Sequence, residues 1–222
     1  MTVKVSIVGA GSVGKALGTA LTRNNLPVIY GVRDAAKHAD LAKLPHTTVK
    51  SVSDAIKSTD VIIVAVPGAH DDAGVKAIAE SLGPEVAGKV VIDATNPLGG
   101  WPGLDARWKE GTSAGEVMAA ALPNSVVYKA FNTVPFEYMA DTKGYIPGLS
   151  PTLMFAGGPE RKDEVEAVIK GVGFEPAYVG PIRYARNLEA FAELWVHLGV
   201  PGAGTSAKWG RTFHFQVVRK PE

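Results

Sequence analysis

The chain has 222 residues and no cysteine, and its 23 Lys and Arg residues nearly balance its 22 Asp and Glu residues. This length accommodates one α/β domain with a small second lobe, while a formal net charge of +1 argues against nucleic acid and anionic membranes as partners. The lack of cysteine excludes disulfides and cysteine-ligated metals, and no apolar stretch approaches the ~20 residues that cross a membrane. The first residues read as a strand without a basic n-region or cleavage site, so we expect a soluble cytoplasmic protein.

A glycine-rich turn directly follows the first predicted strand, residues 3–8. The turn, Gly9-Ala-Gly-Ser-Val-Gly14, has the GxGxxG spacing. Its first glycine permits a tight turn, the second lets the backbone approach a pyrophosphate, and the third lets the next helix pack on the strand. That helix, predicted over residues 13–23, would direct free N–H groups at the phosphates. A purely structural glycine turn is the alternative, but the strand–turn–helix order favours a dinucleotide site.

The second predicted strand, residues 27–31, ends without a carboxylate. A dinucleotide that lacks a 2′-phosphate is usually held there by Asp or Glu, whereas this chain offers Tyr30, then Arg33 with Lys37 close behind. A guanidinium binds a phosphate through two parallel hydrogen bonds, and cations before a helix oppose its dipole unless an anion joins them. We therefore predict NADP(H) rather than NAD(H). The alternative is that both cations are ordinary solvated charges.

Strands and helices alternate along the rest of the chain. The apolar runs are rich in Val and Ile and nearly continuous, which is typical of strands buried on both faces of a parallel sheet. We predict further strands over 61–66, 90–94, 126–131, 152–156 and 176–179, with helices over 35–44, 53–60, 71–82, 116–121 and 161–172. This alternation favours an α/β fold with a Rossmann-type, doubly wound and mostly parallel sheet.

A domain boundary is predicted near residue 135, which divides an NADP-binding domain, 1–135, from a smaller C-terminal α/β lobe, 136–222. The lobe would end in an apolar helix over 186–198 and a final strand over 212–218, and it would complete the substrate cleft. The apolar helix suits either a homodimer face or the covering of the sheet. The loop 97–112, with Trp101 and Trp108, is expected either to cover the cleft or to form a surface excursion.

Ligands of open α/β sheets bind beyond the carboxyl ends of the strands. Pro67, Asn96 and Asn132 follow predicted strands, and the two asparagines suit a carboxamide or a ribose hydroxyl, although asparagine is also a common turn residue. His70 is a candidate contact or a local hydrogen-bonding residue. Lys129 lies near a strand end, where its ammonium would face the cleft or extend to the surface.

An acid–base relay of the kind that alcohol dehydrogenases use is not evident at these strand ends, so we assign no catalytic residue. The histidines have no metal-ligand spacing, and we predict no metal site. A nicotinamide site without an acid–base pair suits hydride transfer to a second conjugated ring, which is chiefly a matter of positioning.

Six blocks of the chain resemble the F420-dependent NADP oxidoreductase family, which passes hydride between NADPH and the deazaflavin coenzyme F420. The blocks are residues 7–14, 31–34, 64–67, 93–98, 129–133 and 179–189. The resemblance implies that the segment around Arg33 binds the 2′-phosphate and that Pro67, Asn96 and Leu98 lie along the nicotinamide half. Val32 departs from the family, which often has a small polar residue there. Related reductase domains use a flavin, so FMN and FAD join F420 as expected acceptors.

The predicted NADP(H) contacts are Gly9, Gly11, Ser12, Val13, Gly14, Val32, Arg33, Lys37, Val66, Pro67, His70, Thr95, Asn96, Pro97 and Leu98. The predicted function is hydride transfer between NADP(H) and F420 or a flavin as a small-molecule substrate. A non-catalytic NADP(H)-binding redox sensor and a reductase of a small carbonyl or imine substrate are the alternatives.

Overall fold

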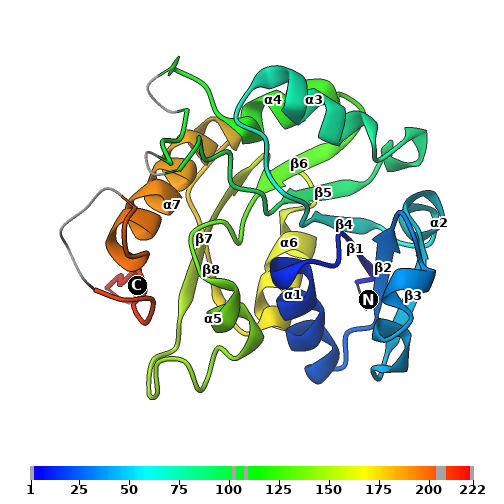
Figure 1. The fold of residues 1–222 in the computed structure, drawn as a ribbon, viewed down its shortest axis with the longest axis horizontal. Coiled ribbons are helices and arrows are strands. Elements are labelled where there is room, and N and C mark those ends of the chain that lie inside the picture. Colours follow the sequence, from blue (N-terminus) through cyan, green and yellow to red (C-terminus); the bar gives the residue numbers. More distant parts are fainter. Residues whose placement is uncertain (1–2, 102–103, 108–109, 204–208, 221–222) are drawn as a thin grey trace.

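The computed structural model describes residues 3–101, 104–107, 110–203 and 209–220. Its strands form one eight-stranded sheet in the order β3-β2-β1-β4-β5-β6-β7-β8 (Figure 1). The strands are β1 (Val5–Val8), β2 (Val28–Val32), β3 (Thr47–Ser51), β4 (Val61–Val64), β5 (Val90–Asp93), β6 (Val126–Lys129), β7 (Thr152–Gly157) and β8 (Glu175–Tyr178). The first six are mutually parallel in the order 3-2-1-4-5-6 of dinucleotide-binding domains, which confirms the predicted Rossmann-type fold.

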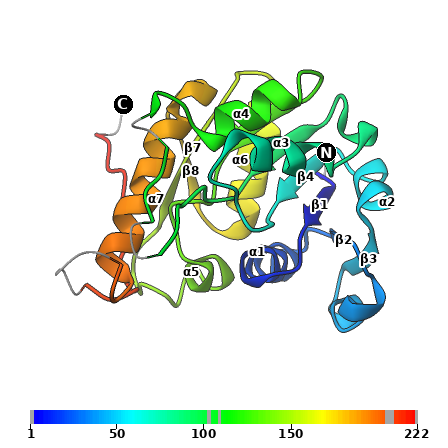
Figure 2. The ribbon, with the colours of Figure 1, turned by 45° about the horizontal axis from the view of Figure 1, so that its top comes forward.

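Helices cover both faces of this sheet. They are α1 (Ser12–Arg23), α2 (Val52–Lys57), α3 (Asp72–Glu80), α4 (Ala114–Ala121), α5 (Phe136–Ala140), α6 (Lys162–Val172) and α7 (Ala185–Gly199). Figure 2 shows α3 and α4 on one side of the sheet and α1 and α5 on the other. Alternate residues of β4 enter the two cores, Ile63 on the α1 side and Ile62 on the α3 side. Burial on both faces explains why these strands are continuously apolar.

The second part of the chain extends the same sheet. β7 pairs antiparallel with β6, Lys129 lying opposite Ala156, and β8 then pairs parallel with β7. The predicted division at residue 135 stays a prediction. Within α7, Leu188 and Trp195 are buried whereas Phe191 and Leu194 are exposed, so this helix both covers the sheet and presents an outer apolar face. No described helix is long and apolar enough to cross a membrane.

The helix predicted over residues 35–44 is wrong. The structure has two short 3₁₀ turns there, Ala36–His38 and Leu41–Lys43, and then the unpredicted edge strand β3. Leu41 is the buried residue of the two turns, so the segment lacks an apolar face that could hold a helix against the sheet. β3, with the sequence TTVKS, has little apolar signal because an edge strand needs one buried face at most.

The final strand predicted over residues 212–218 is also wrong. This segment is extended but belongs to no ladder, and side chains hold it: the Val217 N–H donates to Thr152 Oγ1, and Gln216 bonds to Ser150 and Thr152. β7 pairs with β6 only at Ala156 and Gly157, and at the start of β7 the side chains of Gln216 and His214, instead of a strand backbone, bind the backbone N–H and carbonyl of Thr152.

Candidate functional site

The three glycines of the first turn occupy three different environments. Gly9 has φ +110°, and a Cβ there would lie 2.5 Å from the carbonyl oxygen of Ala65. A Cβ on Gly14 would lie 2.2 Å from the carbonyl oxygen of Gly9. A Cβ on Gly11 would meet no protein atom within 4 Å. Two glycines are therefore required by the packing of the turn, whereas Gly11 leaves its approach open, as a bound pyrophosphate requires.

The N-terminus of α1 has unsatisfied hydrogen-bond donors. Gly11 is its N-cap, no side chain caps the helix, and its first turn contains no acidic residue. Ser12 is exposed and Val13 is half-buried at this end. The free N–H groups and the positive end of the helix dipole are therefore directed at the open space beside Gly11.

Tyr30, which stands near the end of β2, packs beneath α1. Its hydroxyl donates to the carbonyl oxygen of Gly14 at 3.2 Å, and burial raises its pKa to about 12. Gly18 makes room for this ring, because a Cβ there would lie 1.9 Å from the hydroxyl oxygen. The small residues of α1 thus allow the helix to lie close to β2.

The end of β2 carries the predicted 2′-phosphate contacts. Val32 is buried, and Arg33 is exposed without a hydrogen bond or ion pair to another described residue. Lys37 lies 3.6 Å from Asp34, an exposed pair of little strength. Because residues 35–44 form two short 3₁₀ turns and no α-helix, no α-helix dipole opposes these two cations. Arg33 remains the available cation at this strand end.

Sheet register brings the predicted contacts to one edge of the sheet. Gly31, Val8, Val64, Asp93 and Lys129 lie in one row across β2, β1, β4, β5 and β6. The glycine turn, Arg33, the segment 66–68 and the loop 95–98 all follow this row. The strand order reverses direction at β1 and β4, which is where such sheets bind their ligands.

Two of the loops at this edge are fastened together. His70 donates its Nδ1–H to the carbonyl oxygen of Pro97 at 2.9 Å. A Cβ on Gly68 would lie 2.1 Å from the carbonyl oxygen of Asn96, so the loop after β4 lies directly against the loop after β5. Val66 is half-buried and Pro67 is exposed. His70 thus has a local hydrogen-bonding role, and a contact with the cofactor stays a prediction.

Asn96 and Asn132 lie together at the ends of β5 and β6. The Nδ2 of Asn96 donates to the Asn132 carbonyl at 3.1 Å, and the Nδ2 of Asn132 donates to the Leu188 carbonyl at 2.9 Å. Because a backbone carbonyl can only accept a hydrogen bond, the amide nitrogen of each asparagine must point toward its carbonyl partner. Both Oδ1 atoms are therefore acceptors, and both are buried without a partner. Next to them, Thr95 and Pro97 are buried and Leu98 is half-buried.

Lys129 neither faces a cleft nor extends to the surface. Its ammonium is fully buried and donates to Asp93 Oδ2 at 2.9 Å and to the Thr95 carbonyl at 2.8 Å, and it lies 3.1 Å from Glu189 Oε1. Burial by itself would lower the pKa of Lys129, but the two carboxylates outweigh it and raise that pKa. This cluster was not predicted from the sequence. It could have been recognised because two opposite charges, Asp93 and Lys129, end two adjacent strands.

Within the loop 97–112, described residues contact both α3 and α7. The Ala106 N–H donates to Glu193 Oε2 at 2.7 Å, and Arg107 pairs with Asp72 at 2.6 Å. Trp101 is 60% exposed, and Trp108 lies outside the described residues. The loop is thus tied down by polar groups rather than by Trp101.

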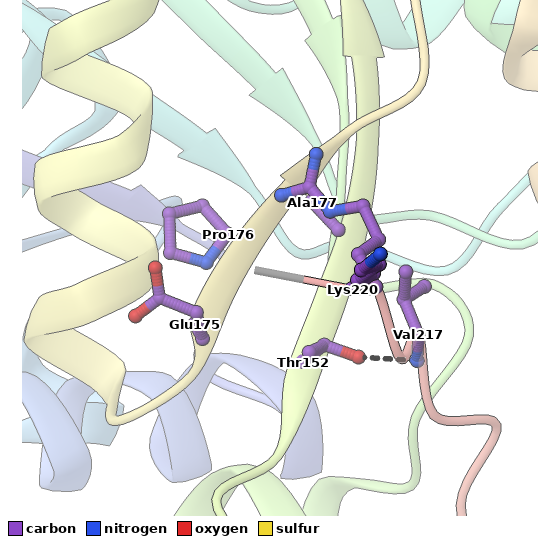
Figure 3. Close-up of a pocket in the computed structure, with 7 residues that line it drawn as sticks. Thr152, Glu175, Pro176, Ala177, Val217 and Lys220 are labelled. Carbon is purple, nitrogen blue, oxygen red and sulfur yellow. Dashed lines mark hydrogen bonds between the residues drawn. The ribbon is translucent and has the colours of Figure 1, made fainter. Parts of the chain in front are cut away.

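Two surface hollows lie away from the predicted contacts. One of about 400 Å³ lies at the start of β7 and β8, where the C-terminal segment crosses them (Figure 3). The other, of about 320 Å³, lies at the start of α7 and is lined by Arg183, Tyr184, Arg186, Asn187 and Ala190. Neither hollow includes a residue of the glycine turn. Among the described residues, no group of three or more histidine and acidic side chains could hold a metal ion.

Residues 4–97 match the family described as NADP oxidoreductase, coenzyme F420-dependent. The chain is also similar to NADP(+)-dependent ketol-acid reductoisomerases: it is 34% identical over 82 residues to that of Methanobrevibacter smithii and 37% identical over 67 residues to that of Pseudarthrobacter chlorophenolicus. These stretches are 37% and 30% of this chain and 24% and 20% of the relatives, so the chain spans less than a quarter of their length.

Solved structures agree with these similarities. A proposed F420-dependent NADP reductase from Arthrobacter sp. FB24 has a TM-score of 0.78 at 25% identity, over 98% of this chain and 100% of that chain. An imine reductase from Myxococcus stipitatus in complex with NADP+ has a TM-score of 0.58 at 22% identity, over 86% and 60% of the two chains, and shares the fold. The resemblance predicted from the sequence is confirmed over residues 4–97, the part of the chain that matches the family.

Proposed function

Because residues 4–97 match the F420-dependent NADP oxidoreductases, we propose that this chain transfers a hydride between NADP(H) and a deazaflavin or flavin acceptor. The observation that best supports the proposal is the environment of Gly11, whose Cβ position is open while those of Gly9 and Gly14 are closed by backbone oxygens. A turn shaped by packing alone has no need of the open position.

The residues at this edge suit the parts of NADP(H). The N–H groups of the first turn of α1 would bind the pyrophosphate, and Arg33 would bind the 2′-phosphate. The buried amide oxygens of Asn96 and Asn132 need hydrogen-bond donors, and a nicotinamide carboxamide has an NH₂ group to give. Pro67 and Leu98 would lie beside the nicotinamide ring.

Hydride transfer between two conjugated rings places few chemical demands on the protein. NADPH supplies the hydride, and the acceptor ring takes it up together with a proton from solvent. The chain must therefore hold the rings in contact and exclude water between them, which does not require an acid–base pair. This agrees with loops after the strands that carry amides, prolines and small residues, while the charged pair at the strand ends, Asp93 and Lys129, is fully buried.

The deciding experiment mixes the protein anaerobically with NADPH and, separately, with F420, FMN or FAD, while the visible absorbance of the acceptor is followed. Rapid bleaching of F420 would support the deazaflavin reductase, and bleaching of a flavin would support the flavin-using branch. Tight NADPH binding without bleaching of any acceptor would overturn the proposed reaction in favour of a binding protein that senses NADP(H).

Cofactor preference is tested with Arg33→Ala. A charge-assisted contact contributes about 1.5–3 kcal/mol, so we expect NADPH affinity to fall roughly tenfold to a hundredfold while NADH affinity stays unchanged. Lys37→Ala is the matched control, with a smaller effect, because Lys37 already lies beside Asp34. Titration calorimetry measures the affinity for each cofactor. Tighter binding of NADH than of NADPH by the unaltered protein would contradict the proposed preference for NADP(H).

A further inference from the structure

Three buried charged side chains meet where β5, β6 and α7 come together. Asp93, Lys129 and Glu189 have no exposed surface, and the ammonium of Lys129 lies within 3.1 Å of a carboxylate oxygen of each partner and 2.8 Å from the Thr95 carbonyl. An ammonium has three N–H donors, so these three acceptors use its full capacity. Lys129 therefore has no donor left for a ligand.

The carboxylates of this cluster are equally occupied. Glu189 accepts hydrogen bonds from the N–H groups of Ala114 and Gly115, each at 3.0 Å, at the positive end of α4. Asp93 accepts from the Thr95 N–H at 2.9 Å. Two carboxylates and one ammonium carry one net negative charge, which the start of α4 stabilises. The cluster thus joins β5, β6, α4 and α7 at one point.

Hydrogen bonds from this cluster close into a ring that includes both asparagines. Lys129 holds Thr95, whose neighbour Asn96 donates to the Asn132 carbonyl; Asn132 donates to the carbonyl of Leu188, the residue before Glu189. Between Lys129 and Asn132 the chain turns through Phe131 at φ +66°, a conformation that surrounding contacts must hold in place. The ring fixes the direction of both amides.

We propose that Lys129 is a positioning residue for the nicotinamide half of NADP(H): with Asp93 and Glu189 it holds the loop 95–98 and fixes the orientation of the Asn96 and Asn132 amides toward the carboxamide. The inference rests on the proposed NADP(H)-dependent function. A buried ion cluster stabilises a fold no better than apolar residues of equal volume. Its distinct contribution is the fixed direction of its hydrogen bonds.

The test separates the two halves of the cofactor. NADPH uses both halves of the site, whereas 2′,5′-ADP reaches the glycine turn and Arg33 alone. The variants are Lys129→Met and the double variant Lys129→Met/Glu189→Gln, which retains one net negative charge and so avoids two unpaired buried carboxylates. Lys162→Met, which breaks the partly exposed pair of Lys162 with Glu166, is the matched control.

We expect both Lys129 variants to bind NADPH about tenfold to a hundredfold more weakly, because amides that lose their direction leave buried donors and acceptors unpaired. The affinity for 2′,5′-ADP should stay within about twofold of that of the unaltered protein. Both affinities of the control variant should also stay within that range. The fluorescence enhancement of bound NADPH, which reports on the nicotinamide environment, should fall in parallel.

Three results would overturn the proposal. If the double variant folds and binds NADPH as tightly as the unaltered protein, Lys129 has only a structural role. If the double variant loses affinity for NADPH and for 2′,5′-ADP equally, the fold as a whole is damaged and positioning of the nicotinamide half is not the cause. Failure of the unaltered protein to bind either ligand would remove the proposed function itself, and the inference with it.

Discussion

Gly11 and Gly14 belong to one turn but are subject to different physical constraints. Replacing a glycine by alanine within a helix usually stabilises it by about 1 kcal/mol. At Gly14 a backbone oxygen 2.2 Å from the new Cβ outweighs that gain, because neither group has room to move. Gly11 has φ −78° and open space, so alanine fits it without strain. Packing thus explains one glycine, and the proposed ligand explains the other.

Gly11→Ala and Gly14→Ala should separate ligand binding from packing. Gly11→Ala should change the free energy of unfolding by less than about 0.5 kcal/mol yet weaken NADPH binding at least about tenfold, because its Cβ occupies the path of the pyrophosphate. Gly14→Ala should lower the free energy of unfolding by about 1–3 kcal/mol. Urea unfolding and titration calorimetry measure the two quantities. Unchanged NADPH affinity in Gly11→Ala would count against the dinucleotide site.

The C-terminal segment 209–220 is held in place by side-chain contacts instead of a β-ladder. Arg211 pairs with Glu137 of α5 at 2.8 Å, and the Tyr145 hydroxyl donates to the Arg211 carbonyl. The Nε2 of His214 lies 2.7 Å from the Thr152 carbonyl, while its Nδ1 is buried without a partner. The imidazole ring packs edge-on with the ring of Tyr138. Nε2 therefore carries the proton of the neutral ring, and a second proton would enter an apolar environment.

This geometry predicts an acid-sensitive contact. Burial lowers the pKa of His214 below 6.5, so the unfolded chain takes up this proton at a higher pH than the folded chain. The stabilisation is complete above about pH 6.5 and is lost as the pH falls towards the lowered value, by at most about 1.4 kcal/mol per pH unit. Urea unfolding between pH 5 and 8 measures this slope.

His214→Phe should remove the slope, because the ring is kept and the titration is lost. His38→Gln, which changes a histidine of the surface turn after β2, is the control and should keep it. Glu137 does not interfere: burial opposes its ionisation, but Arg211 outweighs burial and lowers the pKa of Glu137 below 4.5, so its own contribution is lost at a lower pH. An unchanged slope in His214→Phe would assign the acid sensitivity to other groups.

Across the whole molecule, contacts cross the boundary predicted at residue 135. α1 packs against α5 and α6, where Asn24 donates to the Gly171 carbonyl at 2.9 Å, and a Cβ on Gly171 would press on Leu21 and Leu26 at 3.1 Å. β6 would have an open edge without β7. Removing residues 136–222 would therefore expose both an apolar helix face and a strand edge.

We expect the full chain to unfold in urea in one transition, with coincident midpoints by tryptophan fluorescence and far-ultraviolet circular dichroism. The fragment 1–135 should unfold at a lower urea concentration or aggregate, because its core is incomplete. Two separate transitions in the full chain, or a fragment as stable as the whole, would instead establish residues 1–135 as an autonomous domain.

The central strands, the glycine turn and the place of Arg33 after β2 could be predicted from the sequence, because strands buried on both faces require continuous apolar runs and a glycine turn depends on local backbone space. The conformation of three other segments depended on which elements lie next to them in the fold: residues 35–44, the edge strand β3 and residues 212–218. The tertiary structure alone decided that Lys129 meets Asp93, 36 residues earlier, and Glu189, 60 residues later. Buried charges require partners, and only the folded arrangement of distant elements selects them.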